Sequence, residues 1–116
     1  MSVIQVTKQN IKETVDNNEI VIFDFWAPWC GPCKRFGPIF EQVATKHPDV
    51  KFVKVNTDEE QELAGAFEVM SIPTIAVIKD KDIIFVQPGA VNEEILEQIV
   101  KKAKEVDMAK VRTEQT

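Results

Sequence analysis

The sequence predicts a single α/β domain built on a mixed β-sheet, because strand-like and helix-like segments alternate along a short chain. The 116 residues suit one domain, and 44% of them are hydrophobic, which is enough to bury a core. The elements follow the order β-α-β-α-β-α-β-β-α. Strands joined through a helix pair in parallel, whereas strands joined by a short turn pair antiparallel. The sheet is therefore expected to contain both kinds of pairing.

The first third of the chain supplies two strands and a helix. Residues 2–6 alternate weakly between polar and apolar side chains and predict a short edge strand. Thr7 is expected to cap a helix that ends at Asn17 and Asn18, which are typical turn residues. Residues 20–26 are almost wholly apolar, as expected of a central strand that is covered on both faces.

The middle of the chain predicts a long helix and a third strand. The helix runs from about Cys33 to His47, with Pro38 inside it as a source of a kink and Pro48 after it as a stop. His47, the single histidine, is interpreted as a favourable partner of the helix dipole rather than as a catalytic or metal-binding residue. Residues 50–56 form the next strand.

The last half of the chain predicts a helix, a hairpin and a final helix. Asp58 is expected to cap the first of these helices, with Gln61 completing a pair that resembles a capping box. Strands at residues 75–78 and 83–86 have only four residues between them, so they should form a hairpin. The final helix begins at an Asn92 cap and carries acidic residues in its first turn and basic residues in its last.

Composition and charge exclude several classes of function. The chain has 14 basic and 19 acidic residues and a net charge of −5, which argues against a broad nucleic-acid-binding surface. No apolar run approaches the roughly 18 residues of a membrane-spanning helix, and the N-terminus shows no signal peptide. We therefore expect a cytoplasmic protein, with a domain at residues 1–106 and a polar, frayed C-terminal tail at residues 107–116.

Both cysteines lie in the motif Trp29-Cys30-Gly31-Pro32-Cys33-Lys34, at the junction of the apolar strand and the long helix. Two intervening residues place both sulfurs in the first helical turn, close enough to form a disulfide. Cys30 would lie at the helix N-terminus, where free N–H groups and the dipole stabilise a thiolate, the nucleophilic form. Pro32 fits because a first-turn residue needs no N–H donor. Cys33 is expected to be less exposed and to resolve a mixed disulfide.

Asp24 is the exception in the apolar strand of residues 20–26. Burial disfavours the charged form of a carboxylate, so its pKa should be raised. The functional interpretation is a buried general acid and base beside Cys33. The alternative is an acid that faces solvent at the edge of the sheet.

These features together resemble the thioredoxin family over residues 3–106. Phe25-Trp26-Ala27 followed by the Trp29–Lys34 motif resembles the family's active site, and Asp24 its buried acid. Ile72-Pro73-Thr74 resembles its cis-proline loop, and Gly89-Ala90 its late glycine. Several separate motifs in the right order make the match specific, and it implies a five-stranded sheet with helices on both faces.

The resemblance also implies roles for individual residues. Cys30 attacks a substrate disulfide, Cys33 resolves the mixed disulfide, and Asp24 accepts a proton. Lys54 matches the family's lysine near that acid, although an ordinary exposed strand lysine is nearly as good an interpretation of the sequence alone. The implied substrate-binding surface is apolar and consists of Trp29, Gly31, Pro32, Ile72, Pro73, Gly89 and Ala90. An extended substrate would pair with the Ile72 backbone by strand addition.

The function predicted in this way is that of a monomeric protein-disulfide reductase that needs no cofactor of its own. Its partners would be disulfide-containing client proteins and a thioredoxin reductase as electron donor. A disulfide oxidant or isomerase on the same fold is one alternative. A metal-binding module is another, but two cysteines and one distant histidine supply fewer ligands than a zinc site usually has.

Two positions depart from the family pattern. The hairpin turn at Asp80-Lys81 lacks the usual glycine, and Pro88 stands before Gly89 where a branched apolar residue is usual. The first departure affects the geometry of the turn. The second affects the substrate contacts on one side of the substrate-binding surface.

Overall fold

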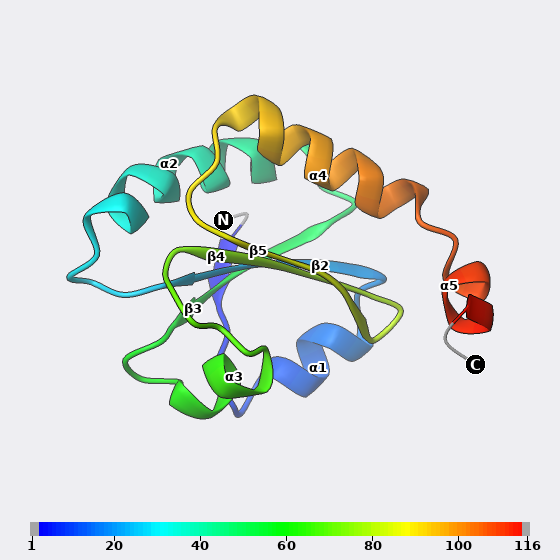
Figure 1. Cartoon of the computed structure of the whole chain (residues 1–116), viewed down its shortest axis with the longest axis horizontal. Coiled ribbons are helices and arrows are strands. Elements are labelled where there is room, and N and C mark those ends of the chain that lie inside the picture. The colour runs from blue at the N-terminus through cyan, green and yellow to red at the C-terminus, as the bar shows by residue number, and fades with distance from the viewer. Residues whose placement is uncertain (1–2, 115–116) are drawn as a thin grey trace.

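The computed structural model describes residues 3–114, and Figure 1 shows a sheet with a layer of helices on each side. The sheet has five strands in the order β1-β3-β2-β4-β5. β1 and β2 pair in parallel with β3, whereas β4 pairs antiparallel with both β2 and β5. The predicted mixed sheet is therefore confirmed. The strands are β1 (Val3–Gln5), β2 (Ile20–Trp26), β3 (Lys51–Asn56), β4 (Thr74–Lys79) and β5 (Asp82–Pro88).

Two helices cover each face of the sheet, as Figure 1 shows: α2 and α4 lie above it, and α1 and α3 lie below it. A short fifth helix, α5, lies beyond the end of α4. The helices are α1 (Ile11–Asp16), α2 (Gly31–Lys46), α3 (Gln61–Ala66), α4 (Glu93–Glu105) and α5 (Met108–Glu114).

The central strand β2 contributes to two hydrophobic cores at once, because successive side chains of a strand point to opposite faces. Ile20 and Ile22 join the core under α2 and α4, and Phe23 and Phe25 join the core over α1 and α3. This double covering is the physical reason for the continuous apolar run. By the same alternation, Asp24 points to the face that α2 and α4 cover.

The predicted cap at Thr7 is confirmed, although it lies one turn before the first residue of α1. The Thr7 hydroxyl accepts a 3.3 Å hydrogen bond from the N–H of Gln9. The Thr7 carbonyl accepts from the N–H groups of Asn10 and Ile11. The Thr7 N–H in turn donates to Asn10 Oδ1 at 2.8 Å, and Asn10, the residue directly before α1, makes no cap bond of its own to the helix. The cap of the final helix is confirmed, because Asn92 Oδ1 accepts a 2.8 Å hydrogen bond from the N–H of Ile95.

Most of the predicted tail is not frayed, because residues 108–114 form α5; its last two positions, 115–116, lie outside the described residues. Met108 is buried, and Arg112 donates to Asp82 Oδ2 at 3.0 Å and to the Asp80 carbonyl at 2.9 Å. One buried apolar side chain and one arginine with two hydrogen bonds therefore hold a segment that composition alone assigns to solvent.

A buried lysine on β4 fixes the C-terminal end of α4. Lys79 Nζ donates to the carbonyls of Ala103, Lys104 and Val106 at 2.8, 3.1 and 2.7 Å. These carbonyls lie at the end of the helix, where intrahelical donors run out and the dipole favours a cation. All three N–H groups of the ammonium are thereby used.

The glycine-free hairpin turn has left-handed backbone at both of its central residues, Asp80 (φ 49°) and Lys81 (φ 74°). A two-residue turn of this type matches the twist of the flanking strands, but it favours glycine at the second position. We expect Lys81→Gly to raise the free energy of unfolding by about 0.5–1 kcal/mol, because it relieves the Cβ clash of a left-handed residue. Urea denaturation measures the change.

Lys81→Ala is the matched control for this substitution. It removes the long ion pair between Lys81 Nζ and Asp16, 3.9 Å apart and exposed, but keeps the Cβ atom. Its stability should stay close to that of the wild type. If Lys81→Gly were no more stable than Lys81→Ala, the turn would store no strain at this residue.

Candidate functional site

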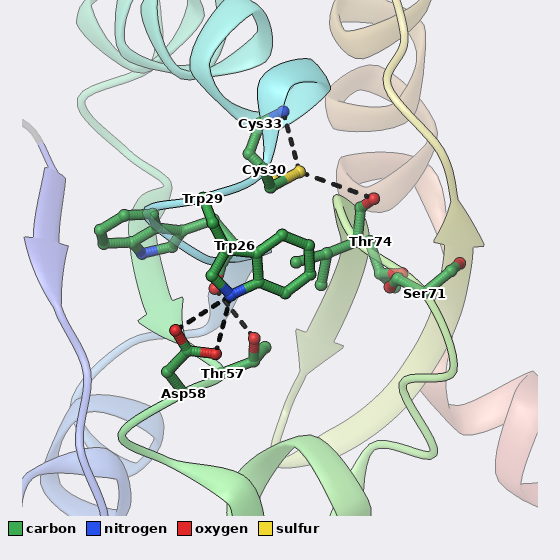
Figure 2. Close-up of a disulfide and its surroundings, with 9 residues drawn as sticks. Trp26, Trp29, Cys30, Cys33, Thr57, Asp58, Ser71 and Thr74 are labelled. Atoms are coloured by element: carbon green, nitrogen blue, oxygen red, sulfur yellow. Dashed lines mark hydrogen bonds between the residues drawn. A yellow bond between two sulfur atoms is a disulfide. The ribbon is translucent and has the colours of Figure 1, made fainter.

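The two cysteines lie where β2 leads into α2, and Figure 2 shows them beside Trp29 and Thr74. Cys30 is the N-cap of α2, and a disulfide joins it to Cys33 with 5.3 Å between the two Cα atoms. The N–H of Cys33 donates to Cys30 Sγ over 3.2 Å. Cys30 Sγ is therefore the sulfur that receives a free N–H group of the first helical turn, as the sequence predicts.

The two cysteines do not differ in exposure, which contradicts the prediction that Cys33 is the less exposed of the two. Each is 4% exposed, because Ala27, Trp26 and Ile72 pack around the pair. What distinguishes Cys30 is its polar surroundings: its sulfur accepts from a backbone N–H and lies 3.8 Å from the Ile72 carbonyl oxygen.

The loop that faces Cys30 contains the expected cis peptide bond, between Ile72 and Pro73. The Pro73 carbonyl accepts a 2.8 Å hydrogen bond from the N–H of Gly89, which has a φ of +94°. This bond holds the Gly89-Ala90 segment next to the cis-proline loop. The structure thus brings together the separate motifs that the sequence places at residues 30–33, 72–73 and 89–90.

Trp29 stands out from the site with 69% of its surface exposed, and its indole Nε1 donates to both carboxylate oxygens of Asp58 at 3.1 and 3.2 Å. Figure 2 shows Asp58 below this ring. Asp58 is therefore not the predicted helix cap, and α3 instead begins after Glu60 without a side-chain cap. The contact follows from the fold: in the parallel pairing of β2 with β3, Trp26 lies opposite Asn56, so the loops that follow leave the sheet side by side.

Asp24 is fully buried, and neither of its carboxylate oxygens has a hydrogen-bond partner in the part of the chain that the structure describes. Loss of solvent raises the pKa of Asp24 to about 7, and the positive charge of Lys54 opposes that rise only in part. The alternative of an acid facing solvent at the sheet edge is therefore wrong.

Lys54 is not an ordinary exposed strand lysine. It lies opposite Asp24 in the parallel pairing of β2 with β3, and its Nζ is 4.8 Å from the centre of the Trp26 ring. It also lines a cavity of about 400 Å³ together with Cys33 and Glu41. This cavity adjoins the inner cysteine and the residue opposite the buried acid.

The comparisons with known proteins agree with this geometry. The family model described as Thioredoxin matches residues 2–111. A Streptomyces coelicolor protein whose curated name places it among the thioredoxins is 46% identical over 96% of this chain and 83% of its own length. The thioredoxin of Bacillus subtilis is 40% identical over 88% of this chain and 98% of its own. The chain belongs to the thioredoxin family.

A solved thioredoxin structure from Plasmodium falciparum matches with a TM-score of 0.79 and 35% identity, over 84% of this chain and 96% of that one. Thioredoxin homologues are thiol-disulfide oxidoreductases. The Cys30–Cys33 pair of this thioredoxin-family chain stands at disulfide distance, as dithiol-disulfide exchange requires.

The single histidine of this thioredoxin-family chain lies away from the cysteines. His47 follows the last residue of α2, at the opposite end from Cys30, and contacts Glu97 through Nε2 and Lys104 through Nδ1. Residues 3–114 contain no group of three or more His, Cys, Asp or Glu side chains that could hold a metal ion. None of the helices over the same residues is both long and apolar enough to cross a membrane.

Proposed function

We propose that this chain is a cytoplasmic protein-disulfide reductase that carries electrons from a thioredoxin reductase to client proteins. The observation that carries the proposal is the hydrogen bond from the N–H of Cys33 to Cys30 Sγ at the start of α2. The same N–H would stabilise a Cys30 thiolate in the reduced protein, and a thiolate is the form that attacks a disulfide.

In the first step, the Cys30 thiolate attacks one sulfur of a client disulfide. A new bond forms between Cys30 Sγ and that sulfur, and the client's own S–S bond breaks. The leaving sulfur departs as a thiolate and takes a proton from solvent. A mixed disulfide between Cys30 and the client remains.

In the second step, Cys33 loses its proton and attacks Cys30 Sγ, which releases the second client sulfur as a thiolate. Two electrons have then passed from the dithiol to the client, and a reductase restores the dithiol. Asp24 is our candidate for the proton acceptor, because a carboxyl group with a pKa of about 7 can both accept and return a proton near neutral pH. The cavity beside Cys33 and Lys54 has room for water that would carry the proton.

The surface that would receive the client surrounds the disulfide. Trp29 offers an exposed aromatic ring held by Asp58, and the Ile72 backbone offers pairing to an extended chain. The remaining members of this proposed surface are Gly31, Pro32, Pro73, Gly89 and Ala90.

The molecular setting that we propose is simple. The chain acts as a monomer, and residues 1–106 form the domain that carries the activity. It needs no cofactor of its own and binds neither nucleic acid nor membrane. The resemblance of Gly31-Pro32 to reducing members of the family supports reduction rather than oxidation as the main direction.

Reduction of insulin with and without a thioredoxin reductase tests this function. We expect insulin precipitation to require the protein, the reductase and its electron source together. The reduction potential should lie near about −270 mV, which is typical of a reducing thioredoxin, rather than near about −120 mV, which is typical of a strong disulfide oxidant. A protein that speeds disulfide formation in a reduced substrate but does not reduce insulin would contradict the proposal.

A further inference from the structure

A second cavity, of about 350 Å³, lies between the edge strand β5 and helix α4. Its volume is within the usual range for ligand-binding pockets. Apolar side chains from both elements line it, among them Phe85, Ile95 and Ile99, with Val91 before α4 and Val106 after it. We call it the β5–α4 groove. It belongs to neither the disulfide nor the cavity beside Lys54.

The β5–α4 groove is bordered by exposed apolar residues on an unpaired strand edge. Phe85 on β5 is 38% exposed and Ile95 on α4 is 43% exposed. An edge strand presents backbone N–H and C=O groups that no neighbour pairs, and proteins commonly blunt such an edge with charges or proline. β5 carries a charge only at Asp82 and a proline only at Pro88, which are its two end residues. Between these ends β5 carries neither charge nor proline, and its one irregularity is a register shift opposite Val77 and Ile78 of β4.

One end of the β5–α4 groove lies close along the chain to the surface around the disulfide. Val91 lines one end of the groove and comes two residues after Gly89, whose N–H bonds to the Pro73 carbonyl. Pro73 follows Ile72, whose carbonyl oxygen lies 3.8 Å from Cys30 Sγ. In Figure 1 the segment between β5 and α4 lies at the same end of the molecule as the start of α2. A chain bound at Cys30 can thus run on into the groove.

The wall that α4 contributes is fixed at both ends. Asn92 caps its first turn, and Lys79 binds the carbonyls of Ala103, Lys104 and Val106 at its last. The 13 residues of α4 span about 20 Å at the helical rise of about 1.5 Å per residue. The groove is therefore preformed, and a small disulfide bound at Cys30 is too short to reach along it.

We propose that the β5–α4 groove binds an extended apolar segment of a client protein, which adds to the free edge of β5 and places side chains against α4. The inference rests on the proposed function and names its substrate class: proteins with an apolar segment within about ten residues of the reduced disulfide, a length that spans about 33 Å when extended. Lys102 lines the groove with a positive charge. A basic client segment would be disfavoured there, because like charges repel.

Two synthetic peptides test this inference. Both carry the same disulfide-closed loop, extended by ten residues on each side, with Val and Leu in one peptide and Ser and Gly in the other. We expect the wild type to reduce the apolar peptide with a KM about tenfold lower, the effect of burying roughly one large side chain. In the double variant Phe85→Ser/Ile95→Ser, the ratio of the two KM values should fall to about one.

Ile4→Ser is the matched control, because Ile4 is also exposed, at 36%, but lies on β1 at the other edge of the sheet. It should keep the tenfold ratio, and circular dichroism should show all variants folded. Equal KM values in the wild type, or a ratio that survives in the double variant, would overturn the inference. So would a dimer of the wild type that Ile95→Ser dissociates, because a second copy would then occupy the groove. Failure to reduce either peptide would overturn the proposed function, and this inference with it.

Discussion

Cys30→Ser is expected to lower insulin reduction to the uncatalysed background, whereas Cys33→Ser is expected to accumulate a mixed disulfide with the client. The reason is their position: Cys30 Sγ receives the N–H of Cys33 at the start of α2, and Cys33 lies one turn further in. Without Cys30 there is no attacking sulfur. Without Cys33 the attack proceeds, but nothing releases the client.

Non-reducing mass spectrometry after incubation with insulin measures both outcomes. The Cys33→Ser protein should carry an insulin chain that a reductant removes, and the Cys30→Ser protein should carry none. The double variant Cys30→Ser/Cys33→Ser is the control for non-covalent association. A mixed disulfide in Cys30→Ser and none in Cys33→Ser would reverse the assignment of the two cysteines.

Asp24→Asn is expected to stabilise the protein at pH 7 by about 2–3 kcal/mol. The pKa of Asp24 is about 7 in the folded chain and about 3.9 in an unfolded chain. Between these values the unfolded chain ionises first, so the wild type loses stability as pH rises from about 4 to about 7 and changes little above that. The full penalty at pH 7 is about 3–4 kcal/mol, and an unpaired Asn amide would retain part of the cost.

Urea denaturation between pH 4 and pH 8 measures this effect, with Glu59→Gln as a control because Glu59 is an exposed acid. The wild type and the control should show the same decline of stability with pH, and Asp24→Asn should show less of it. If the decline were the same in all three proteins, Asp24 would not be the group responsible.

The same Asp24→Asn substitution should slow turnover, because Cys33 loses its proton acceptor. The mixed disulfide should then persist longer in single-turnover experiments, while its formation by Cys30 is less affected. Stability and turnover would thus change in opposite directions. An increase in stability with unchanged release of the client would contradict the role of Asp24 as the proton acceptor.

Local patterns predicted the elements of this fold and the centre of its site. The apolar run of β2, the Asn92 cap and the Cys30–Cys33 spacing each act within a few residues, so a single segment contains the whole signal. The burial of Asp24 follows in the same way, from its place in a strand that is covered on both faces.

The contacts that the sequence did not predict join distant segments. The bond from Trp29 to Asp58 spans 29 positions and depends on the register of two parallel strands. The anchoring of α4 by Lys79 and of α5 by Arg112 likewise needs positions that only the folded chain defines. The equal burial of Cys30 and Cys33 has the same cause, since residues of β2 and of the cis-proline loop cover both.

The pH dependence of alkylation of the reduced protein by iodoacetamide, with the labelled cysteine located by mass spectrometry, tests most directly whether Cys30 is the activated thiol. We expect Cys30 to be labelled first, at a rate whose midpoint lies clearly below the ordinary thiol pKa of about 8.5. Cys33 should react more slowly at every pH below that value. Equal labelling of the two cysteines, or a Cys30 midpoint at or above about 8.5, would contradict an exchange reaction that starts at Cys30.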